Sequence, residues 1–543
     1  MPAARSLHSL DVVIVGAGFA GMYMLHRLRG LHMSTRVFEA GSGVGGTWYW
    51  NRYPGARCDV ESMQYSYSFS SELEQEWQWS ELFASQPEIL RYANHVADRL
   101  DLRRDIQFDT RVIAARFDRT TRRWEVRTDR GDVVSARFCI MATGCLSTAR
   151  TPEFPGSERF AGETYHTGNW PHEPVDFTGL RVGVIGTGSS AIQAVPVIAR
   201  QAAQLFVFQR TPNFSIPSRN QPMTEAYAQT WKRDYPVLRE EVRRMRTGVL
   251  TDPNDQPALA VSEVERSRIY EERWAAGGTR FMAAFNDLIV SQQANDTAAE
   301  FVRNKIRATV HDPATAELLA PKNHPIGTKR ICVDTDYYST FNRDSVTLID
   351  VRATPINEIT ARGLRVGDAE YVLDAIVFAT GFDAMTGALM SVEVSADDIS
   401  LRQKWEAGPR TYLGLMTAGF PNLFIITRPG SPSVLSNMIV SIEQHVDWIT
   451  ECLSHLRSRG VECIEASQDA EDGWVEHGNE VANETLYLLA NSWYMGVNIP
   501  GKPQVFMPYI GGVGRYREIC DAIAAESYRG FELLAPLTAA AAE

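Results

Sequence analysis

DVVIVGAGFAG, residues 11–21, is the stretch that decides the fold of this chain. Its first half is a run of β-branched residues, which is typical of a strand buried on both faces of a parallel sheet. A second strand, predicted over residues 35–38, ends at Glu39, whose carboxylate can accept hydrogen bonds from ribose hydroxyls. Between the strands, a helix follows three glycines spaced for a tight turn, close phosphate approach and close packing of helix on strand: Gly16, Gly18 and Gly21. This order of features predicts a dinucleotide-binding unit.

A second unit of the same design occupies residues 180–211. The acid Glu39 of the first unit is replaced, at the same distance from the first glycine, by Gln209. A carboxylate there would repel a ribose 2′-phosphate, whereas the next two residues, Arg210 and Thr211, can bind one. We therefore predict FAD at the first site and NADPH at the second. The glycine-rich turn expected to hold the NADPH pyrophosphate is Gly186, Thr187, Gly188, Ser189 and Ser190.

Composition narrows the class of protein. Hydrophobic residues make up 44% of the 543 residues and charged residues 22%, which excludes disordered, collagenous and coiled-coil chains. The net charge of −12 does not favour binding to nucleic acid. No apolar run reaches the roughly 18 to 20 residues that span a membrane. The seven cysteines show no Cys-x-x-Cys spacing, so no metal site is expected, and the chain begins without a signal-peptide pattern. We expect a cytoplasmic protein that binds small molecules, as a monomer or weak homo-oligomer.

Two nucleotide sites in one chain favour electron transfer between the nucleotides, and a flavin is the natural acceptor of hydride from a nicotinamide. A disulfide reductase of similar layout would need a redox cysteine pair near the flavin, and the sequence offers none. The remaining chemistry is the reaction of reduced flavin with oxygen.

The predicted fold is α/β, with two Rossmann-like domains and a helical insertion in the second. Apolar strands that end in Ala-Thr-Gly at 142–144 and 379–381 mark the two crossings between the domains. We assign residues 1–147 and 384–543 to the FAD-binding domain, including a mobile loop near 490–505. The NADP-binding domain takes 148–220 and 326–383, and the insertion takes 221–325. Within the first domain we expect a strand over 61–69, a helix over 87–100 and a β-meander over 106–141.

Two longer motifs accompany the glycine turns. Residues 160–171, FAGETYHTGNWP, fit the Phe-x-Gly-x-x-x-His-x-x-x-Trp-Pro signature of type I Baeyer–Villiger monooxygenases. A second pattern of that family is matched by GGTW at 45–48, YPG at 53–55 and Asp59. The sequence resembles this family over nearly its whole length. It looks closest to the phenylacetone and steroid monooxygenase branch, through residues 49–59 and 430–437.

The resemblance implies an NADPH-dependent FAD monooxygenase. In that family NADPH reduces FAD, O2 forms a C4a-peroxyflavin, and this species attacks a ketone to give an ester or lactone. The site must stabilise negative charge and exclude water. Arg330 matches the family's active-site arginine, and Asp59 matches the carboxylate that holds it, so both are expected to be catalytic and to lie beside the cofactors.

Other residues carry over from the same resemblance. Lys329 matches a contact to the NADP 2′-phosphate, and Trp493 matches a mobile-loop tryptophan that hydrogen-bonds the cofactor ribose. Gly46 and Trp48 belong to the flavin side, whereas His166 of the signature is expected to couple the domains and not to catalyse. Residues that match the ketone pocket are Cys145, Leu146, Ser433, Val434, Leu435 and Met438.

Arg428 departs from the family, because relatives usually carry glycine there. If that glycine is needed for a positive φ or a close cofactor approach, either the arginine is reoriented or the pocket is altered. The sequence leaves both alternatives open. It also leaves two rival functions: an N- or S-oxidising flavin monooxygenase, and a catalytically dead NADPH-sensing protein, which retention of Asp59 and Arg330 disfavours.

Overall fold

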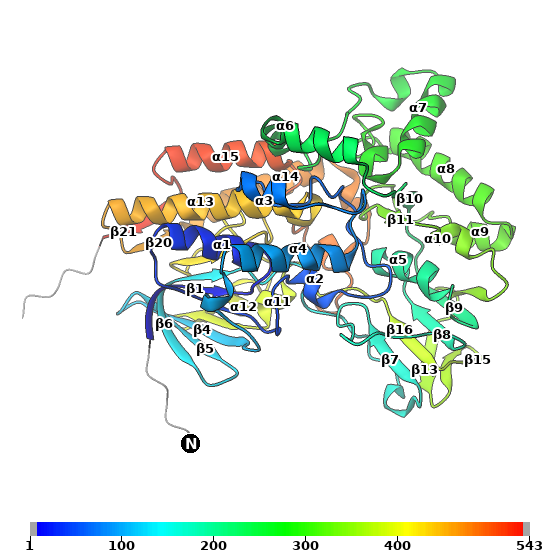
Figure 1. Cartoon of the computed structure of the whole chain (residues 1–543), viewed down its shortest axis with the longest axis horizontal. Coiled ribbons are helices and arrows are strands. Elements are labelled where there is room, and N and C mark those ends of the chain that lie inside the picture. Colours follow the sequence, from blue (N-terminus) through cyan, green and yellow to red (C-terminus); the bar gives the residue numbers. More distant parts are fainter. Residues whose placement is uncertain (1–7, 536–543) are drawn as a thin grey trace, which may run out of the picture.

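The computed structural model describes residues 8–535, so most of the segment inspected for a signal peptide lies outside it. Figure 1 shows two halves, each built around a sheet. In the first, β1 (His8–Val15) lies parallel between β2 (Thr35–Phe38) and β6 (Val133–Met141). Helix α1 (Phe19–Gly30) follows the first glycine turn, as the sequence predicts. The expected α/β class is confirmed.

Segments that precede and follow the second half in the sequence both contribute to the first sheet. β17 (Glu393–Ala396) pairs in parallel with β4 (Val112–Asp118), and β19 (Leu423–Ile425) pairs in parallel with β6. The predicted meander is confirmed, since β4, β5 and β6 are antiparallel neighbours. The remaining strands of this sheet are β3 (Ile106–Gln107), β5 (Arg123–Thr128) and β18 (Ile399–Ser400).

The second half contains a sheet in which every pair of neighbouring strands is parallel. Its strands, in spatial order, are β12 (Val346–Asp350), β9 (Gln204–Gln209), β8 (Arg181–Ile185), β16 (Ala375–Phe378) and β7 (Glu163–His166). Helix α5 (Ser189–Ile198) follows the second glycine turn and contains Pro196 near its end. This is the second dinucleotide-binding unit.

The two Ala-Thr-Gly segments lie against the two glycine turns. Gly16 has φ +103°, and a Cβ there would come 2.7 Å from the carbonyl oxygen of Ala142. Gly186 has φ +116°, and a Cβ there would come 2.4 Å from the carbonyl oxygen of Ala379. Both positions require glycine for the same reason, because the main chain of the crossing segment occupies the space of a side chain.

Helices fill the space around the sheets (Figure 1). The segment after β10 (Ser215–Pro217) is helical, as predicted, and contains α6 (Glu225–Arg244), α7 (Glu263–Ala276), α8 (Gln292–Thr309) and α9 (Pro313–Leu319). Helices of the first half are α3 (Ser71–Glu76), α4 (Gln86–Arg99), α13 (Met438–Ser458), α14 (Gln468–Asn483) and α15 (Val513–Ala525). Among residues 8–535, no helix is long and apolar enough to cross a membrane.

Short elements complete the described chain. The helices are α2 (Thr47–Trp50), α10 (Tyr337–Thr340), α11 (Gly387–Met390) and α12 (Leu401–Lys404). The strands are β10 (Ser215–Pro217), β11 (Cys332–Asp334), β13 (Ile356–Thr360), β14 (Gly363–Val366), β15 (Ala369–Val372), β20 (Cys463–Ala466) and β21 (Phe531–Leu534). The sequence does not predict the small β13–β15 sheet.

The predicted strand over 61–69 is wrong. The segment forms turns, in which the carbonyl of Glu61 accepts from the backbone N–H groups of Gln64 and Tyr65. Its alternating aromatic residues pack on α1 instead of on a neighbouring strand: the ring of Phe69 stacks on Tyr23 at 4.4 Å between centroids. Alternation therefore reflects contact with a helix here, and periodicity alone cannot distinguish the two cases.

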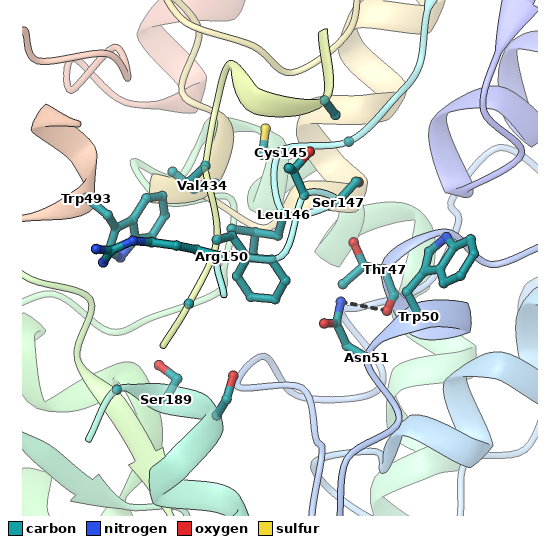
Figure 2. A pocket seen from close by; sticks show the side chains of 18 of the residues that line it. Thr47, Trp50, Asn51, Cys145, Leu146, Ser147, Arg150, Ser189, Val434 and Trp493 are labelled. Atoms are coloured by element: carbon teal, nitrogen blue, oxygen red, sulfur yellow. Dashed lines mark hydrogen bonds between the residues drawn. The ribbon is translucent and has the colours of Figure 1, made fainter. Parts of the chain in front are cut away.

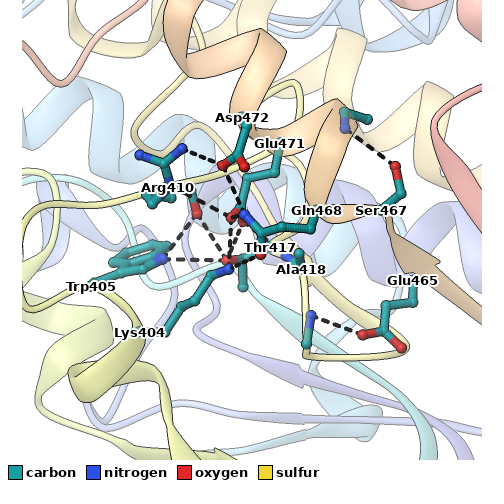
Figure 3. A network of polar contacts seen from close by, with 12 residues as sticks. Lys404, Trp405, Arg410, Thr417, Ala418, Glu465, Ser467, Gln468, Glu471 and Asp472 are labelled. Atoms are coloured by element: carbon teal, nitrogen blue, oxygen red, sulfur yellow. Dashed lines mark hydrogen bonds and ion pairs between the residues drawn. The ribbon is translucent and has the colours of Figure 1, made fainter.

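A buried carboxylate fastens α14 to the chain between α12 and β19 (Figure 3). Glu471 is fully buried and accepts hydrogen bonds of 2.8 Å from the Thr417 hydroxyl and the Ala418 N–H. Its other oxygen pairs with Lys404 at 2.8 Å. These donors compensate the charge, whose burial without partners would be strongly unfavourable.

His445, in α13, gives a testable dependence of stability on pH. The ring is fully buried; its Nδ1 accepts from the Thr427 N–H at 3.1 Å, and its Nε2 lies 2.9 Å from the Tyr516 hydroxyl. Burial lowers its pKa to about 3. Because the folded-state pKa is lowered, the contribution of His445 is complete above the unfolded pKa near 6.5 and is lost as pH falls toward about 3.

We expect His445→Gln to flatten this dependence. Between about pH 7 and about pH 5, wild-type protein should lose about 2 kcal/mol more unfolding free energy than the variant, which cannot titrate there. Denaturant titrations at the two pH values measure the difference. Equal losses in both proteins would show that His445 takes no part in acid sensitivity.

Candidate functional site

A cavity of about 790 Å³ lies between the two sheets, at the carboxyl ends of their parallel strands. Val15 and Phe38, the last residues of β1 and β2, form one side of its wall. Ile185 and Phe208, from the ends of β8 and β9, form another. Ligands of open α/β sheets bind at this edge, so the topology indicates a ligand site here.

The first glycine turn offers a cradle for a pyrophosphate. Gly18 and Gly46 face one another, and a Cβ on Gly46 would come 2.9 Å from the Cα of Gly18. Glu39 lies beside them, 5% exposed, and accepts hydrogen bonds of 2.7 Å from the N–H groups of Ala17 and Gly41. Burial raises the pKa of this carboxyl, and the two amides oppose the shift. Gly16 and Trp48 also line the cavity.

Gly21 does not line the cavity, although the sequence pattern assigns it to the cofactor. A Cβ at this position would come 1.8 Å from the carbonyl oxygen of Gly16. Its role is therefore to let α1 pack against the turn that precedes it. The third glycine of this fingerprint serves the close packing of helix and strand, whereas the first two, Gly16 and Gly18, line the cavity.

The second turn lines the same cavity with all of its predicted residues, from Gly186 to Ser190. A Cβ on Gly188 would meet open space, so the turn leaves room in front of the N-terminus of α5. The Thr187 hydroxyl donates to the carbonyl of Thr211 at 2.6 Å, which joins the turn to the chain just after β9. Arg210, Thr211 and Lys329 line the cavity beyond it. These features fit a dinucleotide with an additional phosphate.

Arg330 and Asp59 form a two-pronged ion pair in the cavity wall. The Nε and Nη2 of Arg330 donate to the two oxygens of Asp59, each at 2.8 Å, and Nη1 donates to the Val434 carbonyl at 2.6 Å. The charge of Asp59 raises the pKa of Arg330 above its ordinary value, so the guanidinium keeps its charge. Three hydrogen bonds therefore fix a permanent cation at the cavity.

An apolar group of side chains lies next to this cation, and Figure 2 shows several of them around the cavity. Cys145, Leu146, Val434, Met438 and Trp493 belong to it and line the cavity wall. The other two residues assigned to the ketone pocket do not line the wall: Ser433 is fully buried behind Cys145, and Leu435 packs within the apolar group.

Comparisons with known proteins agree with this geometry. A family model described as "Pyridine nucleotide-disulphide oxidoreductase" matches residues 13–236. A "Baeyer-Villiger monooxygenase" from Pseudooceanicola batsensis is 41% identical, covering 95% of this chain and 95% of its own length. This chain belongs to the Baeyer–Villiger monooxygenase family. The solved "Oxidized steroid monooxygenase bound to NADP" is 55% identical, with a TM-score of 0.94, covering 97% of this chain and 100% of that chain.

The relatives also include a different printed activity. A "Phenazine N-monooxygenase" from Lysobacter antibioticus is 39% identical, covering 96% of this chain and 96% of its own length. The disulphide chemistry in the name of the family model has no counterpart in this chain's cysteines, because all seven are buried and unpaired.

Several residues of this family member escape sequence reasoning. The Tyr53 hydroxyl donates to the Oε1 of Gln193 at 2.8 Å, and a Cβ on Gly55 would come 2.4 Å from the Gln193 carbonyl oxygen. The YPG motif, residues 53–55, thus packs the first half of the molecule against α5 of the second half. Arg111 lines the cavity near Glu39, and Arg150 lines it after the first crossing. Gln193, Arg111 and Arg150 have no local sequence signal, because their contacts join segments far apart in the chain.

Arg428 is turned behind the cavity wall. It is fully buried, its own φ is not positive, and its Nη1 donates to the Met385 carbonyl at 2.6 Å. Its Nη2 donates to the hydroxyl of Thr143, a residue of the wall. Of the two alternatives for this departure from the family, the structure supports reorientation of the side chain. Burial lowers the pKa of the guanidinium.

Proposed function

We propose that this chain is an FAD- and NADPH-dependent Baeyer–Villiger monooxygenase that uses O2 to convert ketones to esters or lactones. The observation that carries the proposal is the Arg330–Asp59 pair, which holds a permanent cation between two nucleotide cradles. Flavin, when bound, supplies the reaction with oxygen. The chain's own residues bind the two nucleotides, stabilise negative charge and exclude water.

The roles of the residues follow from their places in the wall. We assign FAD to Gly16, Gly18, Glu39 and Gly46, with Trp48 beside them, and NADPH to the turn from Gly186 to Ser190. Trp493 is assigned to the NADPH side. Arg330 would stabilise negative charge during oxygen transfer, as a preorganised donor does in other enzymes, while Asp59 keeps it in position. The apolar group beside it, including Cys145, Leu146, Val434 and Met438, would receive the ketone and displace water.

A second candidate function is N-oxidation, which the 39% identity to a phenazine N-monooxygenase favours. Product analysis separates the two. Purified yellow protein with NADPH and oxygen should give esters or lactones from a ketone panel. If the protein forms N-oxides from a matched panel of N-heterocycles and no ester from the ketones, N-oxidation is its function and the proposal is wrong. Bleaching of the flavin by NADPH without any oxygenated product would indicate a protein that only senses NADPH.

Arg210→Gln should shift the choice of nicotinamide cofactor. Loss of a charge-assisted hydrogen bond to the 2′-phosphate should reduce the preference for NADPH over NADH by about 1.5 to 3 kcal/mol. The ratio of kcat/KM for the two cofactors measures this change. An unaltered ratio would show that another residue selects the cofactor.

The remaining features of the proposal concern organisation. We propose that the two crossings near 147 and 383 separate an FAD-binding domain from an NADP-binding domain, with the helices of 221–325 inserted in the second. We also propose a cytoplasmic protein that is a monomer or a weak homo-oligomer. Size-exclusion chromatography with light scattering measures the oligomeric state.

A further inference from the structure

Three cations line the cavity without acidic partners. Arg150, Arg210 and Lys329 all line it, and within residues 8–535 none of their side chains has a hydrogen bond or an ion pair. Burial lowers the pKa of Arg150 and of Lys329, and the charge of Arg210 lowers both further. Like charges that act on one another repel, so the arrangement favours a ligand with more than one negative charge.

The backbone of Arg150 is held firmly at the first crossing. Its N–H donates to the Gly381 carbonyl at 2.9 Å, and its carbonyl lies 2.9 Å from the Nε2 of His166 and accepts from the Thr380 hydroxyl at 2.5 Å. The Nδ1 of His166 accepts from the Gly168 N–H, which leaves a proton on Nε2 for the carbonyl. The signature histidine therefore acts on the position of Arg150, whose side chain extends into the cavity (Figure 2).

We propose that Arg150 is a specificity-determining residue that binds the 2′-phosphate of NADPH together with Arg210 and Lys329. The inference rests on the proposed function, because it assumes NADPH at the second site. The pyrophosphate has its own donors in the turn from Gly186 to Ser190 and the N-terminus of α5. The main chain of Arg150 is held by Thr380 and Gly381 just after β16, at the same edge of the sheet as Arg210, which follows β9 at the position where a 2′-phosphate is recognised.

The test compares two adenine nucleotides that differ in one phosphate. Oxidised holoenzyme is titrated with 2′,5′-ADP and with 5′-ADP by calorimetry, for wild type, Arg150→Gln and Arg150→Lys. We expect Arg150→Gln to weaken binding of 2′,5′-ADP by about 10- to 100-fold, the scale of a hydrogen bond between charged groups, with 5′-ADP changed less than about twofold. Arg150→Lys should recover part of the loss, since it keeps the charge but not the fork of donors.

Two controls make the result specific. Arg200 is exposed, lies outside the cavity and has no side-chain partner among the described residues, so Arg200→Gln removes a charge from the same half without touching the site. It should leave both affinities unchanged. In Arg150→Gln/Arg210→Gln, the losses for 2′,5′-ADP should not add, because both side chains contact one phosphate.

Two outcomes would overturn the proposal. Equal weakening of both nucleotides by Arg150→Gln would place the guanidinium on a phosphate that both ligands share, and unchanged affinities would remove it from the site. Neither outcome depends on oxygenation, because the titration uses oxidised enzyme and no ketone. Absence of ester products would contradict the proposed function and leave this measurement intact.

Discussion

Arg330→Ala should retain reduction of the flavin by NADPH and lose ester formation. The guanidinium is the permanent cation at the cavity, fixed by Asp59 and the Val434 carbonyl, and alanine leaves nothing to stabilise developing negative charge. Removing one such preorganised donor lowers kcat by roughly 10²- to 10³-fold in other enzymes, and we expect at least this loss. Anaerobic bleaching of the flavin measures the first step, and chromatography of products from a ketone panel measures the second.

Arg330→Lys is the matched control, since it keeps the charge but cannot make the two-pronged contact to Asp59. It should retain more ester formation than alanine and less than wild type. If Arg330→Ala makes ester at the wild-type rate, the role assigned to this pair is wrong. If flavin reduction is lost as well, the arginine is needed earlier, for productive NADPH binding.

Gly21→Ala should prevent the flavin-binding half from folding and from binding flavin. The added methyl would lie 1.8 Å from the carbonyl oxygen of Gly16, so α1 cannot keep its place on β1. We expect a loss of several kcal/mol, at the extreme of what single substitutions cause, with colourless or insoluble protein. Soluble yield and the flavin-to-protein absorbance ratio measure the effect.

Gly30→Ala provides the comparison within the same helix. Gly30 is exposed at the last position of α1, and a Cβ there would meet nothing within 4 Å. Alanine should be neutral or stabilise by about 0.5 to 1 kcal/mol, because it reduces the freedom of the unfolded chain. A yellow, stable Gly21→Ala protein would show that α1 can shift away from the turn without loss of flavin.

The sequence predicts what is encoded locally and fails where distant segments meet. Both βαβ units could be predicted, because strand, turn and helix lie within a few tens of residues in each. The segment 61–69 was predicted as a strand because alternating apolar residues look the same whether they pack on a strand or, as here, on the helix α1. Gly21 was assigned to the cofactor with Gly16 and Gly18 because all three belong to one fingerprint, although the third position serves packing. Arg111, Arg150 and Gln193 were missed because their importance arises from contacts across the fold.

The order of synthesis has a consequence for how the molecule matures. The first sheet receives its last strand, β19, only when residue 425 has been synthesised, and α1 receives its partner α13 only when residue 458 has left the ribosome. The all-parallel sheet is complete at Phe378. Because domains fold as units and non-local pairing is slow, the later-starting half should form first and the amino-terminal half should wait for the rest of the polypeptide.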